Sequence, residues 1–136
     1  MTRVEHGAFR LSMRIYWEDT DAAGIVFYAN YLKFFERART EWLRDLGVGQ
    51  EALRRDGIAF VVSETSVRYR RPARLDDVIE VSVEVVHLGQ ASFEIAQQAR
   101  RADELLADGA IRIGCVELGT FRPCRIPNDI RMSIHR

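Results

Sequence analysis

Cysteine and proline are both scarce in this chain of 136 residues. The two cysteines, Cys115 and Cys124, are too few and too irregularly placed for a disulfide framework or a zinc site. We therefore expect both to be reduced thiols. The three prolines stand alone at Pro72, Pro123 and Pro127, and no tract rich in Gly, Ser or Pro divides the chain into separate units.

An excess of charge of either sign is also missing, because 20 basic and 20 acidic residues balance. Nucleic-acid-binding domains usually carry a basic excess, so the balance argues against electrostatically driven binding to nucleic acid. No run approaches the roughly 20 apolar residues that a membrane span needs. The N-terminal segment lacks the apolar core of a signal peptide, so we expect a cytoplasmic protein without a membrane span.

The composition that remains is that of an ordinary globular protein. Hydrophobic residues make up 47% and charged residues 29% of the chain, which excludes a disordered polar chain. The length suits one domain. A chain of about 150 residues buries roughly 68–70% of its unfolded surface, so folding needs neither a disulfide nor a metal. We expect residues 1–9 to form a loose N-terminal end.

Hydrophobic periodicity predicts one strand, two helices and then four strands. Residues 11–17 alternate as a half-buried strand does. Apolar residues at spacings of three and four predict an amphipathic helix that is capped by Asn30 and ends at Gly47, with a shorter helix at residues 50–55. Pro123 and Pro127 predict turns or loose structure near the C-terminus. The four later strands are predicted at residues 59–71, 78–87, 92–101 and 110–118.

This order predicts an α+β fold in which the long helix lies on one face of an antiparallel sheet. Short turns join neighbouring strands as antiparallel hairpins. The helix that contains Phe35 and Trp42 is the one long apolar partner for the sheet. The second face and the edges of the sheet still need cover, so we expect a homo-oligomer, either a dimer or a tetramer.

The segment between the first strand and the long helix lacks periodicity and concentrates the chemistry. Glu18, Asp19 and Asp21 precede a small, apolar turn that contains Gly24. A carboxylate just before a helix lies near free N–H groups, and such N–H groups also stabilise negative charge that develops on a carbonyl oxygen. Acyl transfer needs both groups. Acids before a helix more often form caps and turns, however, and composition alone favours that structural role.

A metal site is the third interpretation of these acids. His6, His87 and His135 all lie far from them in the sequence. Hard cations usually require more oxygen ligands than this loop offers. We therefore expect neither a metal nor another cofactor.

The order of residue types in this loop is a specific signature: acid, small residue, Gly, apolar residues and aromatic residues, joined directly to the helix. Further matches occur at residues 59–62 and 72–77 and at the two C-terminal prolines. These segments resemble the hotdog-fold acyl-CoA thioesterases of the Tol-Pal-associated (YbgC-type) and 4-hydroxybenzoyl-CoA thioesterase families. The signature reads Tyr16-Trp17-Glu18-Asp19-Thr20-Asp21-Ala22-Ala23-Gly24-Ile25-Val26-Phe27-Tyr28-Ala29-Asn30-Tyr31 and continues as Phe35-Glu36-Arg37-Ala38-Arg39-Thr40-Glu41.

The resemblance covers residues 10–131 and implies one hotdog domain, in which a five-stranded antiparallel sheet wraps a long helix, followed by a C-terminal tail at 132–136. Asp21 matches the family's catalytic carboxylate, which acts as a general base on water or as a nucleophile. The backbone N–H of Tyr28 matches the donor that polarises the thioester carbonyl. Many Tol-Pal-type members carry His at this position, so the role of that side chain does not carry over.

The resemblance also implies an acyl-CoA substrate, with an acyl carrier protein as an alternative carrier. Arg71 and Arg74 flank Pro72 and suit the phosphates of coenzyme A, although a solvated strand end is the competing interpretation. The apolar residues of the loop either wall the acyl group or fill the core. The candidate substrate contacts are Gly24, Ile25, Val26, Phe27, Phe60, Arg71 and Arg74.

Two rival functions remain open on the sequence. The same fold can bind an acyl-CoA or an acyl carrier protein without turnover, or can serve as a partner in an envelope complex. A hotdog dehydratase is a weaker rival, because those enzymes usually place a His beside the acid and this loop has none.

Overall fold

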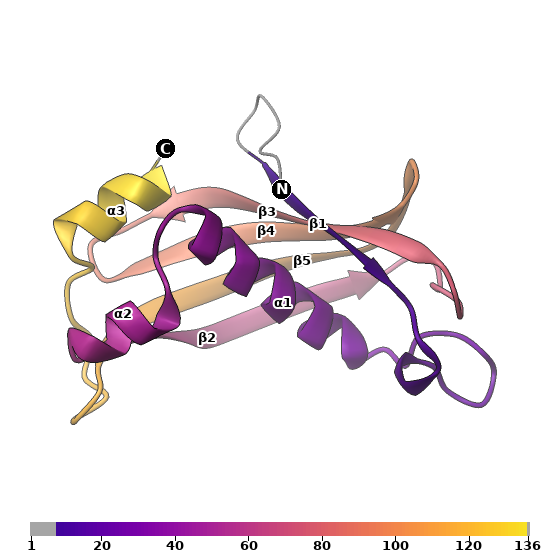
Figure 1. The fold of residues 1–136 in the computed structure, drawn as a ribbon, viewed down its shortest axis with the longest axis horizontal. Coiled ribbons are helices and arrows are strands. Elements are labelled where there is room, and N and C mark those ends of the chain that lie inside the picture. Colours follow the sequence, from indigo (N-terminus) through magenta and orange to yellow (C-terminus); the bar gives the residue numbers. More distant parts are fainter. Residues whose placement is uncertain (1–7, 136) are drawn as a thin grey trace.

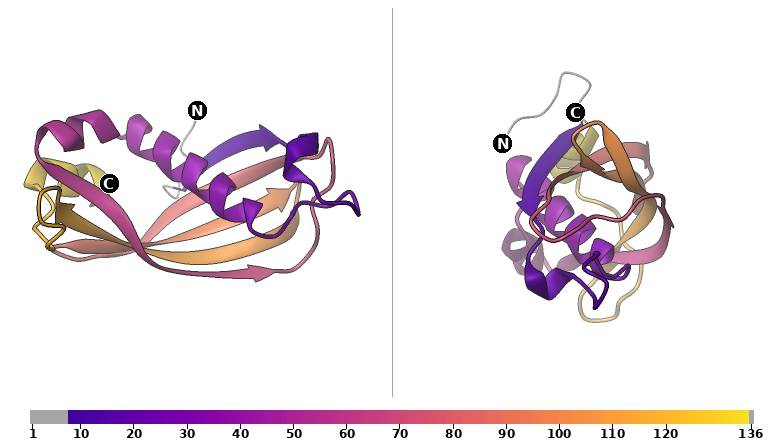
Figure 2. Two further views of the ribbon diagram at one scale, coloured as in Figure 1. Left: turned by 90° about the horizontal axis from the view of Figure 1, so that it is seen from below. Right: turned by 90° about the vertical axis from the view of Figure 1, so that its right-hand side faces the viewer.

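The structure, a computed structural model, describes residues 8–135 as one antiparallel sheet that curves around a long helix (Figures 1 and 2). The α+β class and the hotdog arrangement expected from the sequence are confirmed. The elements in chain order are β1 (Phe9–Arg14), η1 (Trp17–Asp19), α1 (Asn30–Asp45), α2 (Gln50–Arg55), β2 (Ile58–Tyr69), β3 (Val78–Leu88), β4 (Ser92–Arg101), β5 (Glu104–Glu117) and α3 (Asn128–His135).

The sheet has the strand order β1-β3-β4-β5-β2, and every neighbouring pair is antiparallel. Strands β1 and β2 are therefore its two edges. The prediction for β4 matches residue for residue. Strand β5 instead begins at Glu104, well before the predicted residue 110, because its first half pairs with both β4 and β2 despite the turn-like Asp108-Gly109.

The first strand starts and ends earlier than predicted. Phe9, which the sequence analysis places in the loose end, is fully buried and pairs with Val83. At the other end Trp17 belongs to η1 and not to the strand. The long-range pairing with β3, which periodicity alone does not reveal, decides both boundaries. The rest of the expected loose end, residues 1–7, lies outside the described residues.

Helix α1 lies against the inner face of the sheet, as the left view of Figure 2 shows. Phe35 is fully buried and packs over Gly109 of β5. A Cβ atom at Gly109 would come within 2.9 Å of the Phe35 ring and within 3.2 Å of the carbonyl oxygen of Ser66. A glycine is required here because the helix approaches the sheet so closely. The buried side chains of α1 are Tyr31, Phe34, Phe35, Ala38, Trp42 and Leu43.

The ends of α1 agree with the prediction in position but differ in chemistry at the start. Ala29 is the N-cap residue, and Asn30 is already helical. The Asn30 side chain donates a hydrogen bond to the backbone carbonyl of Asp19 at 2.8 Å and caps nothing, which corrects the predicted N-cap. At the far end Gly47 adopts φ +83°, a left-handed conformation suited to glycine after a helix.

The C-terminal segment is more ordered than the sequence suggests. Pro127 precedes helix α3, and its carbonyl accepts a hydrogen bond from the N–H of Arg131 at 2.8 Å. Ile130 and Ile134 are buried on the face that α3 turns to the core. The expected tail at residues 132–136 is therefore helical through His135. No helix within residues 8–135 is long and apolar enough to cross a membrane.

The two cysteines lie close together as free thiols, as expected for reduced residues. The Sγ atoms of Cys115 and Cys124 are 3.6 Å apart. Burial, reinforced by the neighbouring thiol, raises the pKa of Cys115 to about 12. This thiol therefore stays protonated at neutral pH and behaves as a small apolar residue of the core.

We expect Gly109→Ala to lower the free energy of unfolding by about 1–3 kcal/mol, because the added methyl group must displace the Phe35 ring or the β2 backbone. Gly114→Ala on the same strand is the matched control, since no heavy atom lies within 4 Å of the position its Cβ would take. Urea unfolding of the two variants and the wild type measures the difference. Equal stability of the two variants would contradict the close approach of α1 to β5.

Candidate active site

The loop between η1 and α1 folds back on itself as a short hairpin that Asp19 holds together. Asp19 is buried, and its carboxylate accepts a hydrogen bond from the N–H of Tyr16 at 2.9 Å. Its backbone carbonyl accepts from the N–H of Phe27 at 3.1 Å and from the Asn30 side chain. An antiparallel bridge between Thr20 and Val26 continues the pairing. The structural role that acids often play before a helix thus belongs to Asp19.

Asp21 lies at the turn of this hairpin. Its backbone N–H donates to the carbonyl of Ile25 at 2.8 Å, and one carboxylate oxygen accepts from the N–H of Ala23 at 2.8 Å. Gly24 closes the turn with φ +80°, a conformation that other residues adopt only under strain. The Asp21 side chain is exposed in the single protomer and has a free carboxylate oxygen within residues 8–135.

Tyr28 occupies the turn that leads into α1. Its carbonyl accepts from the N–H of Tyr31 at 3.3 Å, so the chain already curls into the helix at this point. No acceptor within the described part of the chain binds the N–H of Tyr28 itself. The result is an unpaired backbone donor at the start of a 16-residue helix, where the helix dipole adds partial positive charge.

An aromatic cleft of ≈ 280 Å³ adjoins this donor. The Tyr28 ring contacts Tyr69 edge-on with centroids 5.8 Å apart, and Tyr31 approaches Tyr69 to 5.5 Å. Burial raises the pKa of both Tyr31 and Tyr69, so the two phenols stay neutral. Ile25 and Val26 of the loop complete the apolar part of the lining. The cleft thus joins a largely apolar wall, with Arg70 and Arg71 at its side, to the unpaired N–H at the helix start.

The segment after β2 supports the loop and supplies the arginines. The N–H of Val26 donates to the carbonyl of Ala73 at 2.9 Å, and an isolated bridge joins Ile25 to Arg74. Arg71 lines the cleft and forms an ion pair with Glu104 at 3.2 Å. No ion pair within residues 8–135 engages the Arg74 side chain, which leaves its charge free for a ligand.

A turn at residues 74–77 fixes the backbone of Arg74. The carboxylate of Asp77 accepts from the N–H of Arg74 at 2.8 Å and from the guanidinium of Arg101 at 2.5 Å. Burial alone would raise the pKa of Asp77, but these two donors outweigh it and hold the pKa below its usual value. Asp77 is thereby kept ionised, and the turn that carries Arg74 is rigidly held.

The structure brings four of the nine predicted site residues into one cleft, which Ile25, Val26, Tyr28 and Arg71 line. Phe27 packs against Tyr28 with ring centroids 4.9 Å apart and is half-exposed. Asp21, Gly24 and Arg74 belong to the neighbouring turns and do not line the cleft. The ninth candidate, on the first part of β2, lies at the opposite end of that strand from the cleft.

That candidate is Phe60, which contacts Phe93 with centroids 5.3 Å apart and pairs with Cys115 of β5. Nine residues separate it from Tyr69 in a strand that rises about 3.3 Å per residue, so roughly 30 Å separates the two positions. Within one protomer Phe60 therefore cannot contact the cleft.

Four residues of the cleft were not predicted as site residues: Tyr31, Tyr69, Arg70 and Pro72. The Tyr31 hydroxyl accepts a hydrogen bond from the N–H of Ala73 at 3.2 Å, and its ring lines the cleft. The sequence places one tyrosine near the start of the helix and another at the end of the following strand, but only the folded structure shows that Tyr31 and Tyr69 are in contact.

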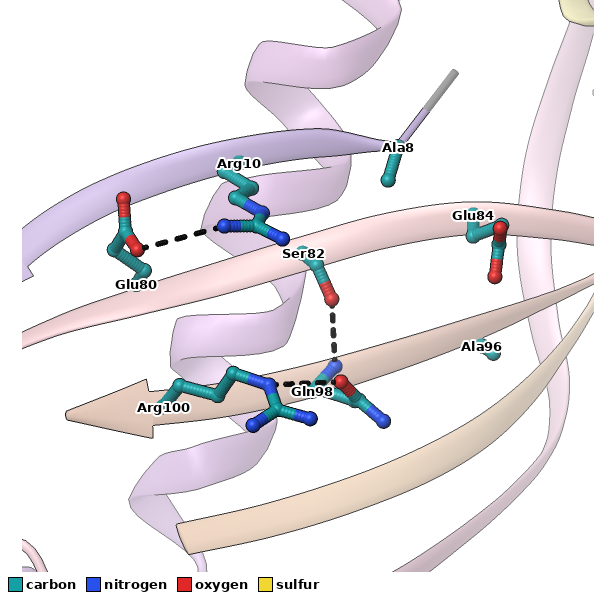
Figure 3. A pocket seen from close by; sticks show the side chains of 8 residues that line it. All are labelled: Ala8, Arg10, Glu80, Ser82, Glu84, Ala96, Gln98 and Arg100. Carbon is teal, nitrogen blue, oxygen red and sulfur yellow. Dashed lines mark hydrogen bonds and ion pairs between the residues drawn. The ribbon is translucent and has the colours of Figure 1, made fainter. Parts of the chain in front are cut away.

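The outer face of the sheet has a second hollow, drawn in Figure 3 with the strands in front of α1. Its polar side chains mostly interact with one another: Arg10 lies 3.9 Å from Glu80, and Arg100 donates a hydrogen bond to the Gln98 side chain at 3.1 Å. None of the predicted site residues lies there. No group of three His, Cys, Asp or Glu side chains within residues 8–135 is placed to hold a metal ion.

Comparisons with known proteins agree with this geometry. The family model for the Thioesterase-like superfamily matches residues 15–134. The chain is 38% identical over 128 residues to the acyl-CoA thioesterase YbgC of Haemophilus influenzae, covering 93% of this chain and 94% of that protein. It is 40% identical over 123 residues to the acyl-CoA thioester hydrolase YbgC of Escherichia coli, covering 90% and 92%.

Solved structures give the same result. A probable thioesterase from Bartonella henselae superposes with a TM-score of 0.83 at 30% identity, covering 88% of this chain and 99% of that one. The family model spans the loop, α1 and the segment after β2. On the strength of the family match, the sequence identity and the shared fold, this chain belongs to the Thioesterase-like superfamily of hotdog proteins.

Proposed function

We propose that this protein hydrolyses acyl-CoA thioesters to a carboxylic acid and free coenzyme A. The observation that carries the proposal is the junction of loop and helix, where an exposed carboxylate, Asp21, and the unpaired N–H of Tyr28 belong to one short hairpin beside an apolar cleft. The relatives named as acyl-CoA thioesterases support the same reaction class. An acyl carrier protein presents the same thioester and is the alternative carrier.

The chemistry requires few groups. The N–H of Tyr28 donates to the thioester oxygen and stabilises the negative charge that develops there. In one route Asp21 takes a proton from a water molecule, whose oxygen attacks the carbonyl carbon, and the C–S bond then breaks. In the other route Asp21 attacks that carbon itself, the C–S bond breaks to leave a mixed anhydride, and water then hydrolyses the anhydride and releases Asp21. Because the parent thiol has a pKa of about 8.5, the thiolate leaves without a strong acid.

The nucleotide end of coenzyme A is assigned to the arginines after β2. Arg74 has a free charge among the described residues, and its backbone is fixed by Asp77. Arg71 lies in the cleft wall and shares its charge with Glu104. Guanidinium groups bind phosphates with paired hydrogen bonds, so these two residues suit the phosphates of coenzyme A. Ile25, Val26 and Phe27 then lie on the acyl side.

A second copy of the chain completes the site. Strand β2 is a 12-residue edge strand whose middle, from Val61 to Ser66, is exposed. An edge strand of this length offers unpaired backbone groups to another strand. Antiparallel pairing of two β2 strands about their midpoint joins the two sheets and places Phe60 of the partner subunit opposite Val67, beside Tyr69. This pairing unites Phe60 with the other predicted site residues.

Replacing Asp21 by Asn keeps the shape of the side chain but removes the base and the nucleophile. We expect turnover of acyl-CoA by Asp21→Asn to fall by about a hundredfold or more. Release of free thiol, followed with a panel of acyl-CoAs of different chain length, is the measurement. Glu18→Gln, an exposed acid of the same loop, is the matched control and should hydrolyse like the wild type.

Wild-type turnover by folded Asp21→Asn would overturn the role of this carboxylate. Tight binding of acyl-CoA by the wild type with no thiol release on any member of the panel would favour the rival function, a binding module.

Replacing Thr65 by Arg places two like charges close together near the two-fold axis of the proposed dimer. Such juxtaposition opposes association, so we expect Thr65→Arg to elute as a monomer and to lose hydrolysis together with the dimer. Light scattering after size exclusion gives the mass. Ser12→Arg on the other edge strand, β1, is the control and should leave the mass unchanged. A wild-type protein that is fully active as a monomer would refute the pairing through β2.

A further inference from the structure

A further cavity, distinct from the aromatic cleft and from the outer hollow, lies between α1 and β2 on the inner side of the sheet. Its volume is ≈ 230 Å³. Glu36, Arg39 and Thr40 of the helix form its polar side, and Phe60 and Phe93 form its apolar side. The cavity therefore places a charged group opposite an aromatic wall, a combination that orients a ligand with an apolar body and one polar end.

The charged group is the Arg39 guanidinium. Arg39 is half-buried, and burial lowers its pKa from the usual arginine value, against the opposing effect of Glu36. Its Nη1 donates to Oε1 of Gln97 at 3.0 Å. No carboxylate within residues 8–135 lies within ion-pair distance of it. A guanidinium carries five N–H donors, so Arg39 has N–H groups available to bind an anion. A partly desolvated charge without a counter-ion is also unfavourable, which favours binding of an anion.

Gln97 holds this arginine in place. It is fully buried, and its Nε2 donates to the carbonyl of Phe35 at 3.0 Å and to the carbonyl of Ser82 at 3.3 Å. Because both amide hydrogens are engaged by the backbone, the amide oxygen is turned toward Arg39. The guanidinium is thus anchored by a rigid neutral acceptor that leaves its positive charge uncompensated. Arg–carboxylate recognition gains from such preorganisation.

We infer that the cavity between α1 and β2 binds the far end of the acyl group and that Arg39 recognises a terminal carboxylate there, so that the preferred substrates are thioesters of dicarboxylic acids. The inference rests on the proposed thioesterase function and on the pairing through β2. Phe60 is the link, because it lines this cavity and, in the dimer, lies beside Tyr69 of the partner subunit.

An acyl group that extends from one protomer's cleft therefore runs along Phe60 into the cavity of the other. Its apolar chain contacts Phe60 and Phe93, and its carboxylate replaces the missing counter-ion of Arg39. A methyl-ended chain of equal length displaces water from the guanidinium without pairing its charge, which carries a desolvation penalty. Glu36 is exposed and outside ion-pair distance, so solvent screens its repulsion of the incoming carboxylate.

The test compares matched pairs of ligands that differ only at the far end: glutaryl-CoA with pentanoyl-CoA, adipoyl-CoA with hexanoyl-CoA, and suberoyl-CoA with octanoyl-CoA. Binding is measured by calorimetry in the Asp21→Asn background, which prevents turnover during the titration. We expect one pair or more to favour the carboxylate-ended ligand by about tenfold or more in Kd, the range for a hydrogen-bonded charge pair. Adding Arg39→Gln should abolish that preference.

Arg37→Gln is the matched control, because Arg37 is an exposed arginine of the same helix whose guanidinium lies over the Phe34 ring at 5.9 Å. It should keep the full preference. Arg39→Lys keeps a positive charge but lacks the paired N–H groups, so we expect it to retain part of the preference, and it also serves if Arg39→Gln does not fold.

Equal affinity for both members of every pair, or an equal loss of both affinities in folded Arg39→Gln, would overturn the inference and leave Arg39 with a structural role. Dissociation of the dimer by Arg39→Gln without any wild-type preference would overturn it in favour of an interface role. A preference in binding that is not matched by thiol release from the wild type would refute the proposed hydrolysis and support the acyl-binding role of Arg39.

Discussion

The contact between Phe35 and Gly109 determines how closely α1 approaches the sheet, and the space between α1 and β2 depends on that approach. A side chain at position 109 would meet the Phe35 ring, so the helix approaches β5 only because this residue is glycine. The Phe35 carbonyl also accepts a hydrogen bond from the buried Gln97, which anchors Arg39 in turn. The same short stretch of helix thus connects the close packing of the core to a charged group at the edge of a cavity.

The loop before α1 divides two tasks between two aspartates that lie close together in the sequence. Asp19 is buried and holds the hairpin with its carboxylate and its carbonyl. Asp21 is exposed at the turn and has a carboxylate oxygen that the described residues leave free. A buried carboxylate such as that of Asp19 is poorly placed to meet water or a substrate, whereas the exposed Asp21 is accessible to both. The separation lets a loop of this length hold its shape and still present a free carboxylate for the proposed chemistry.

The two edges of the sheet are not equivalent. Strand β1 has 6 residues, whereas β2 has 12 and leaves its middle exposed. A long exposed edge strand presents more unpaired backbone N–H and C=O groups, so β2 can pair with a second copy of the chain over a greater length than β1 can. Phe60 and Tyr69 lie toward opposite ends of β2, so the cavity between α1 and β2 and the aromatic cleft are separate within one protomer. The proposed pairing through β2 brings the two together across the dimer.

The sequence by itself determined the α+β class, the position of α1 and of strands β2, β3 and β4, and the loop that carries Asp21 and Tyr28, because these follow from local periodicity, glycine conformation and a motif contained in one short segment. Tertiary structure decided the rest. The early start of β5, the burial of Phe9 and the helix after Pro127 all depend on partners distant in the sequence, which override local signals. The meeting of Tyr28, Tyr31 and Tyr69 and the uncompensated charge of Arg39 were likewise hidden, because solvation and neighbours across the sheet exist only once the chain has folded.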